Sequence, residues 1–185
     1  MAKVLENTLS TIDWNDVLSN LGEGDKRDVA KIWDNKSSLP DTPSYNAYKE
    51  VFERCEKAGY RISDIYWYDY FSGKNYPESV DNEFAKFTGS TFLRSWISRV
   101  DPGRNVPYHW DVDDRADEWK ELGELIRFTC FIDAPKWGSA FIIEDELFYG
   151  LEQGTIVEWN SWDSYHAATV AGKEPQYLYH FLGYL

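Results

Sequence analysis

From residue 91 onward the sequence consists of short strand-like segments at regular intervals, and this spacing restricts the fold more than any other feature. Each segment is rich in β-branched and aromatic residues, and Gly- or Pro-bearing turns separate most of them. The predicted strands are residues 92–100, 106–111, 126–133, 140–144, 155–159, 164–170 and 177–184. Short strands in such a series predict a β-sandwich or barrel.

The first 90 residues predict mostly helices. Residues 14–21 follow Asp13, a suitable N-cap, and end before Gly22. The clearest helix covers residues 44–58, where apolar side chains recur at three and four positions. Shorter helices are predicted at residues 25–34 and 77–86, and a strand at residues 65–71.

Two of the C-terminal strands need apolar partners on both faces. The strands at residues 128–132 and 177–182 carry apolar side chains on both faces, so one sheet requires a cover on its outer side, which the N-terminal helices can supply. The length of 185 residues predicts a single domain, 1–185, with residues 1–90 as a mostly helical cover and residues 91–185 as the β core. We therefore expect a mainly β fold with helices over one sheet.

Composition limits the partners of the chain. Nineteen basic and 32 acidic residues give a net charge of −13, which argues against binding to nucleic acid or to an anionic membrane surface. Cys55 and Cys130 are far apart and unaccompanied, as is typical of reduced thiols in a cytoplasmic protein. No segment is long and apolar enough to cross a bilayer. The oligomeric state stays open.

A histidine and a carboxylate in one predicted strand indicate a metal site. His109 and Asp111 are two positions apart in residues 106–111, so an extended backbone points both side chains to one face. They supply two of the three ligands of the 2-His-1-carboxylate arrangement that holds non-haem Fe(II) and leaves positions open. The chain has two other histidines, His166 in the strand at 164–170 and His180 in the last strand.

The order of these features resembles the 2-oxoglutarate- and Fe(II)-dependent oxygenases. A His-x-Asp motif is followed by short strands, by His166 57 positions after His109, and by a terminal apolar strand. Residues 125–132 and 154–160, with the Tyr165-His166 pair, are most similar to the aspartyl/asparaginyl β-hydroxylase-like branch. The resemblance covers residues 90–185.

This resemblance implies a double-stranded β-helix, the jelly-roll fold of the cupins. It implies Fe(II) held by His109, Asp111 and His166, and 2-oxoglutarate as cosubstrate. The implied activity is that of a dioxygenase, a hydroxylase, in which oxidative decarboxylation of 2-oxoglutarate to succinate and CO2 is coupled to oxidation of a C–H bond. The substrate, a small molecule or a peptide, cannot be identified from the sequence.

The distal carboxylate of 2-oxoglutarate needs a cation, and the resembled branch has an arginine about ten residues after its distal histidine. Here the tenth residue after His166 is Gln176, whose amide carries no charge. Arg127 is our preferred anchor, because it shares a strand face with Thr129 and matches the arginine of the branch's second cosubstrate-facing strand. Weaker candidates are Arg94, Arg99 and Lys173.

Two further side chains are candidates for the cosubstrate pocket. Thr129 lies on the predicted inner face with Arg127, and His180 shares a face with Gln176 in the last strand. If Gln176 replaces the anchor, we expect His180 to point into the barrel and assist cosubstrate binding. Trp159, which precedes the loop to His166, is a candidate for the cleft wall.

Two alternatives from other classes stay open. A cupin-type metalloenzyme without 2-oxoglutarate would use more histidine ligands, which a chain with three histidines can hardly assemble. A non-catalytic jelly-roll binding protein is favoured by the missing distal arginine. Titration with Fe(II) and 2-oxoglutarate separates all three hypotheses.

Overall fold

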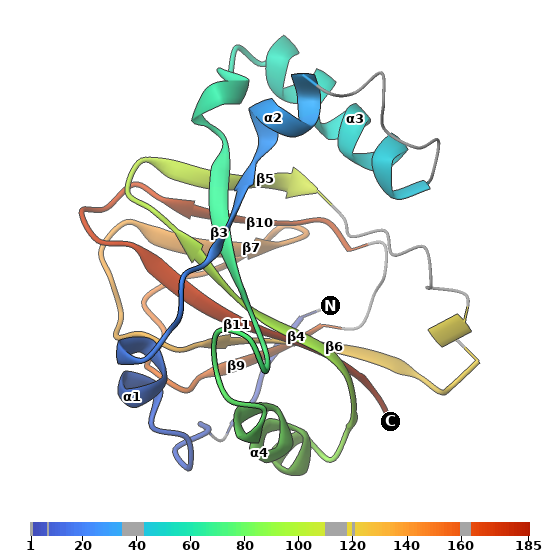
Figure 1. The fold of residues 1–185 in the computed structure, drawn as a ribbon, viewed down its shortest axis with the longest axis vertical. Coiled ribbons are helices and arrows are strands. Elements are labelled where there is room, and N and C mark those ends of the chain that lie inside the picture. The colour runs from blue at the N-terminus through green and yellow to red at the C-terminus, as the bar shows by residue number, and fades with distance from the viewer. Residues whose placement is uncertain (1, 7, 35–42, 110–117, 120, 160–163) are drawn as a thin grey trace.

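Two antiparallel sheets that face each other form the centre of the molecule (Figure 1). The computed structural model describes residues 2–6, 8–34, 43–109, 118–119, 121–159 and 164–185. In the large sheet the central strands are β9 (Ile156–Trp159), β6 (Leu125–Phe131), β11 (Gln176–Tyr184) and β4 (Thr91–Val100), in that order. The small sheet has the order β5 (Arg104–His109), β10 (His166–Val170), β7 (Ser139–Ile143) and β8 (Glu146–Phe148).

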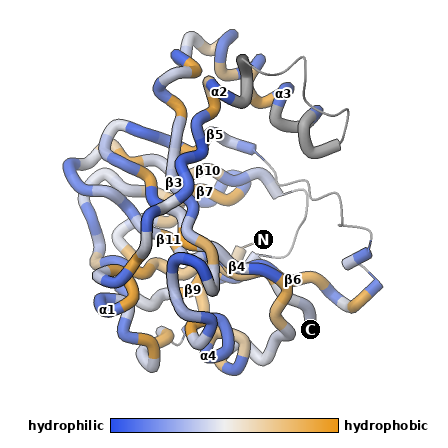
Figure 2. The backbone as a smooth tube through the Cα atoms, viewed as in Figure 1, coloured by the Kyte–Doolittle hydropathy of each residue, from blue (hydrophilic) through white to orange (hydrophobic). Residues whose placement is uncertain are grey.

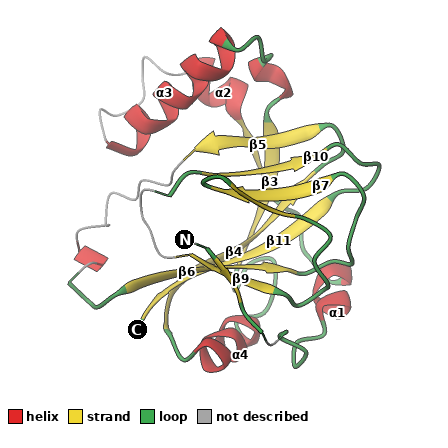
Figure 3. Cartoon of the chain, turned by 180° about the vertical axis from the view of Figure 1, so that it is seen from behind, coloured by secondary structure: helices red, strands yellow, loops and turns green. Residues whose placement is uncertain are grey.

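From β4 onward the chain passes from one sheet to the other at every connection except the one between β7 and β8. β4, β6, β9 and β11 belong to the large sheet, while β5, β7, β8 and β10 belong to the small one, and the two lie as stacked layers (Figure 3). All pairings among these strands are antiparallel. This strand order is that of a double-stranded β-helix, the cupin-like jelly roll, as the sequence predicted.

Three further strands widen the large sheet. β1 (Lys3–Val4) pairs with β9 at one edge, and β3 (Tyr66–Phe71) and β2 (Asp25–Asp28) extend the other edge beyond β4. The prediction of a helix from residue 25 is therefore wrong for its first four residues. Charged contacts of β2 explain the outcome, because Arg27 Nε lies 2.7 Å from Asp69 Oδ2 in β3 and Lys74 Nζ, in the turn after β3, lies 2.8 Å from Asp25 Oδ1. Cross-strand pairing overrides a weak local propensity.

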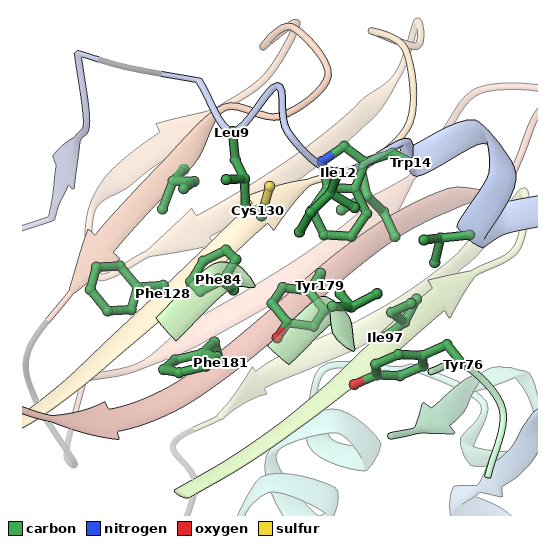
Figure 4. Close-up of a cluster of buried hydrophobic side chains, with 14 of the residues drawn as sticks. Leu9, Ile12, Trp14, Tyr76, Phe84, Ile97, Phe128, Cys130, Tyr179 and Phe181 are labelled. Atoms are coloured by element: carbon green, nitrogen blue, oxygen red, sulfur yellow. The ribbon is translucent and has the colours of Figure 1, made fainter. Parts of the chain in front are cut away.

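Two helices cover the outer face of the large sheet. Trp14 of α1 (Trp14–Ser19) packs on Tyr179, with ring centroids 5.5 Å apart, and Phe84 of α4 (Ser79–Thr88) stacks on Phe181 at 4.9 Å (Figure 4). Asp13 caps α1 by accepting a hydrogen bond from the Asp16 backbone N–H at 3.0 Å. Along α4 hydrophobic and hydrophilic residues alternate in the way expected of a helix with one face on a sheet (Figure 2).

The other helices lie elsewhere, which corrects the prediction that the helices form one cover. α2 (Val29–Asp34), α3 (Pro43–Lys57) and the short 3-10 helix η2 (Ile62–Asp64) surround a separate core of Val29, Val51, Phe52 and Ile65. α3 contacts β5, the edge strand of the small sheet. Val51 and Phe52 of α3 are thus buried against neighbouring segments of the same N-terminal region. No helix in the described parts of the chain has the length and apolar character needed to span a membrane.

The space between the sheets is apolar toward one end and polar toward the other. Phe131, Val157 and Leu178 of the large sheet pack against Phe141 and Val170 of the small sheet. At the opposite end, where β5 finishes and β10 starts, the inner faces carry histidine, arginine and hydroxyl side chains. We call this the site end of the barrel.

Candidate functional site

The two histidines of the proposed triad meet at the site end. His109 is the last residue of β5 and His166 is the first residue of β10, and the antiparallel register places them directly opposite each other. Cross-strand partners share a face, so both rings point between the sheets. Their centroids are 4.4 Å apart, and both residues are buried.

A backbone contact of each imidazole sets which ring nitrogen carries the proton. His109 Nδ1 lies 2.6 Å from the Pro107 carbonyl oxygen, and His166 Nδ1 lies 3.3 Å from the Ser164 carbonyl oxygen. A carbonyl oxygen can only accept a hydrogen bond, so Nδ1 is the protonated nitrogen in both rings. Nε2 then carries the free lone pair. This is the arrangement of a metal-binding histidine, in which one ring nitrogen binds the ion and the other donates a hydrogen bond.

The carboxylate of the motif cannot be placed. Asp111 falls within residues 110–117, which lie outside the described residues. Within the described ranges, no three His, Cys, Asp or Glu side chains come together in a cluster of metal-binding size. Among the described residues the metal-binding groups at this site are therefore two imidazoles. Such a pair suits a divalent transition metal that takes a further oxygen ligand.

Aromatic rings enclose the histidine pair. The ring centroid of Trp159 in β9 lies 4.8 Å from that of His166. The ring centroid of Phe141 in β7 lies 6.2 Å from that of Trp159 and 6.2 Å from that of His166. Trp159 and Phe141 are buried. This wall lowers the access of water to the imidazoles and strengthens electrostatic interactions beside them.

Arg127 lies on the inner face of the large sheet at the site end. In β6 it shares a face with Thr129 and with Phe131, which packs against the small sheet. Arg127 is buried at 6% exposure, and its Cζ atom is 4.8 Å from the centroid of the Trp159 ring. The Arg127 guanidinium is thus placed for a cation–π contact with the Trp159 ring.

Thr129 and His180 belong to a chain of buried hydrogen bonds. Trp159 Nε1 donates to Thr129 Oγ1 at 3.1 Å, and Thr129 Oγ1 is 3.3 Å from His180 Nδ1. On its other side His180 Nε2 is 2.8 Å from Ser98 Oγ, and its ring stacks on Trp96 with 5.0 Å between centroids. His180 therefore lies on the inner face of β11, and its expected role beside the cosubstrate stays a prediction.

Gln176 is separated from this group. It is the first residue of β11, opposite Val100, at the end of the barrel away from the histidine pair. Four residues of extended chain, about 13 Å, lie between it and His180. Its side chain lines a small cavity of about 10 Å³ together with Asp133, Lys136 and Ser139. The structure thus brings His109, His166, Arg127, Thr129 and His180 together, and leaves Gln176 apart.

Sequence reasoning missed three residues of the inner wall, namely Trp96, Ser98 and Phe141. Alternation along residues 92–100 does place Trp96 and Ser98 on one face. Ile97 on the opposite face is apolar like Trp96, however, so the sequence pattern alone does not show which face of the strand points inward. The hydrogen bond between Ser98 and His180 identifies the inner face.

No family model matches the sequence, and no curated protein is significantly similar to it. Among solved structures, a viral collagen prolyl hydroxylase from Paramecium Bursaria Chlorella virus-1, in a 2-oxoglutarate complex, is 13% identical with a TM-score of 0.49. The match covers 74% of this chain and 89% of that protein.

Two other solved structures are similar in the same range. A predicted oxalate decarboxylase from Thermotoga maritima is 8% identical over 65% of this chain and 82% of its own, with a TM-score of 0.40. A cupin domain from Schizosaccharomyces pombe is 11% identical over 64% of this chain and 65% of its own, with a TM-score of 0.39. These proteins resemble the chain in fold alone, and nothing in the comparisons supports the narrower aspartyl/asparaginyl β-hydroxylase-like branch.

Proposed function

We propose that this chain is an Fe(II)- and 2-oxoglutarate-dependent oxygenase, and specifically a hydroxylase. The observation that carries the proposal is the histidine pair at the site end. His109 and His166 face the barrel interior 4.4 Å apart, each with Nδ1 against a backbone carbonyl oxygen. Two imidazoles oriented in this way present Nε2 to one shared ion.

The residues that would hold the metal are His109, His166 and Asp111. The first two are assigned from their geometry, and Asp111 is assigned from its place two residues after His109 in the sequence. Iron and 2-oxoglutarate, when bound, would supply the oxidative decarboxylation to succinate and CO2 that is coupled to C–H oxidation. The two histidines and the aspartate would fix the ion on one side and leave the other side open.

Other inner-face residues would bind and shield the cosubstrate. Arg127 is a buried cation on the sheet opposite the histidine pair, where it can pair with the distal carboxylate. Thr129 and His180 add hydrogen-bonding groups one row deeper in the barrel. Trp159 and Phe141 would exclude water from the reacting atoms. The substrate is a small molecule or a peptide.

The proposal is tested by anaerobic titration of the purified protein with Fe(II) and 2-oxoglutarate. We expect a visible charge-transfer band that needs both components, and slow succinate formation when oxygen is admitted. His109→Ala should lose the band and the succinate, because it removes one of the three proposed ligands of the ion. The matched control is Tyr108→Phe on the same strand, since Tyr108 points outward, is 41% exposed and stacks on Tyr165.

The outcomes separate this function from the alternatives. Metal binding without a band or succinate would point to a cupin-type metalloenzyme that does not use 2-oxoglutarate. No metal binding at all would point to a non-catalytic jelly-roll protein. A band of normal strength in His109→Ala would show that the ion sits elsewhere, and the site assignment would be withdrawn.

A further inference from the structure

The turn that joins β7 to β8 lies beside the histidine pair. It is a two-residue turn formed by Glu144 and Asp145. Ile143, the last residue of β7, is the direct cross-strand partner of His166 in β10, and His166 in turn pairs with His109 of β5. Glu144 therefore follows directly after the row of cross-strand partners that contains both histidines.

Glu144 has an unusual backbone conformation. Its φ of 53° lies in the left-handed region, and among the described residues no other non-glycine residue has a positive φ. A residue other than Gly, Asn or Asp is uncommon in this region, because its side chain adds strain there. Such strain persists only where the surrounding contacts hold the residue in place, and it is found preferentially at functional sites.

Hydrogen bonds attach Glu144 to the residues that precede the two histidines. The Glu144 backbone N–H donates to the carbonyl oxygen of Tyr165, the residue before His166, at 2.7 Å. In return, the Tyr165 backbone N–H donates to Glu144 Oε1 at 2.9 Å. The hydroxyl group of Tyr108, the residue before His109, donates to the Glu144 carbonyl oxygen at 3.0 Å. One residue thus contacts the immediate neighbours of both histidines.

Tyr108 and Tyr165 also contact each other on the outer face of the small sheet. Their rings stack with centroids 5.1 Å apart and 21° between the planes. Alternate side chains of an extended chain point to opposite faces, so the histidine after each tyrosine points between the sheets. The stack needs only the rings, and Tyr108 is exposed to water. The link specific to Glu144 is therefore its reciprocal pair of hydrogen bonds with Tyr165.

The histidines need such a link because they lie at strand ends. His109 is the last residue of β5 and His166 is the first of β10, so strand pairing supports each of them on one side only. The register of β10 against β5 also shifts between His166 and Ala168, as at a β-bulge. A metal ligand has to be held to within about 0.5 Å of its working position. A contact that fixes the Tyr165 backbone also fixes the direction of the next side chain.

We infer that Glu144 is a positioning residue of the proposed metal site, which holds Tyr165 so that the His166 ring faces the ion shared with His109. The inference rests on the proposed function. Glu144 acts through the backbone and not as a ligand, because its carboxylate accepts the Tyr165 N–H while the imidazoles point between the sheets. Without that acceptor the start of β10 has one restraint fewer, and the His166 ring can take more than one orientation.

Metal affinity gives the first test. In calorimetric titration with Mn(II), we expect Glu144→Ala to raise the Kd about tenfold, the lower end of the range for groups that orient metal-bound histidines. Glu144→Gln removes the charge but keeps the oxygen acceptor, so it should recover most of the affinity. The matched control is Asp145→Ala, which removes an exposed acid from the same turn. Equal changes of Kd in Glu144→Ala and Asp145→Ala, or no recovery in Glu144→Gln, would overturn the inference.

Thermal unfolding of the metal-free protein separates positioning from a general loss of stability. Glu144→Gly relieves the strain of the positive φ and removes the side-chain acceptor. We expect its Tm to stay near that of the wild-type protein while its Kd for Mn(II) rises as in Glu144→Ala. A large fall of Tm in both variants would show that the turn supports the whole fold, and the inference would be withdrawn.

Nitrogen-15 NMR of the histidine rings keeps the test independent of metal binding. In the metal-free wild-type protein we expect one set of His166 signals, from the tautomer with the proton on Nδ1. Glu144→Gln should preserve this set, whereas Glu144→Ala should broaden or double it. If the wild-type protein binds no metal, the proposed function fails, and these spectra still decide whether Glu144 positions His166. Identical His166 signals in Glu144→Ala and the wild-type protein would overturn the inference.

Discussion

Four side chains of the barrel are joined by a short chain of hydrogen bonds. Trp159 donates to Thr129, Thr129 contacts His180, and His180 contacts Ser98. An unpaired buried polar group costs about 1–3 kcal/mol, so each member restrains the orientation of the next. The same contacts fix Trp159 against the His166 ring. Thr129, which is fully buried, is the link between the aromatic wall and His180.

Thr129→Val keeps the shape of the side chain and removes its hydroxyl group. Trp159 Nε1 and His180 Nδ1 would lose their shared partner, so we expect the free energy of unfolding to fall by about 2 kcal/mol. Urea denaturation measures the change. Thr129→Ser, which retains the hydroxyl, should lose less. Equal stability of Thr129→Val and the wild-type protein would show that the hydrogen bonds of Thr129 do not stabilise the fold.

Arg127→Ala tests the cosubstrate anchor. Leaving the distal carboxylate unmatched in the barrel costs about 3–5 kcal/mol, so we expect the apparent Kd for 2-oxoglutarate to rise by at least about 100-fold. Equilibrium titration with the metal-loaded protein gives the Kd. Lys173→Ala is the control, because Lys173 is exposed in the turn between β10 and β11. Similar Kd values for both variants would remove Arg127 from the site.

Among the secondary-structure elements, α4 is attached to the sheet by a buried acid as well as by apolar contacts. Asp81 is 3% exposed and accepts hydrogen bonds from Tyr179 Oη at 2.8 Å, from Ser95 Oγ at 2.7 Å and from Ser72 Oγ. Ser95 also contacts Tyr76 Oη at 2.7 Å. These hydroxyl groups come from the sheet and from the segment before α4, so the carboxylate fixes the position of the helix.

Burial raises the pKa of Tyr76 and Tyr179 above the usual value, and the negative charge of Asp81 raises both further. With folded pKa values above the unfolded ones, the stabilisation by the neutral phenols is fully present below about pH 10 and is lost as the pH rises beyond it. We expect their tyrosinate absorbance to appear only together with loss of the circular dichroism signal. If all 13 tyrosines ionise before that loss, the cluster is not buried as described.

The sequence predicted the elements whose pattern is local and missed those that depend on pairing. Residues 92–100 and 177–184 are confirmed as β4 and β11 almost to the residue, because aromatic and β-branched runs favour extended chain. β8, with three residues, is too short to produce a pattern, and residues 25–28 became a strand through contact with β3.

The alternation of side chains along each strand predicted which site residues share a strand face, but not how the strands pair. Alternation of side chains along a strand places His109 on the same face as Asp111, and Arg127 on the same face as Thr129, without any tertiary information. The register of β11 against its neighbours was not accessible, since packing between strands distant in sequence sets it. For that reason the cross-strand row of Arg94, Leu182 and Arg127, and the separation of Gln176, became visible only in the structure.

Across the whole molecule the two ends of the barrel have different tasks. The end that contains Val100, Phe131 and Leu178 is packed with apolar side chains and supplies stability. At the site end, His109 and His166 lie opposite each other on two neighbouring strands of the small sheet. An ion bound there would link the ends of β5 and β10, so metal binding should stabilise the folded chain as a whole.

Thermal unfolding with and without a divalent metal measures this linkage. At a metal concentration about 100 times the Kd, binding to the folded state adds about 2.7 kcal/mol, which for a chain of this size raises Tm by about 8 °C. We expect this shift with Mn(II) or Fe(II), its reversal by a chelator, and a further rise with 2-oxoglutarate. The net charge of −13 attracts any divalent cation, so Mg(II) and the His109→Ala variant serve as controls. The same Tm shift with Mg(II), or in His109→Ala, would mean that surface charge and not the imidazole pair binds the ion.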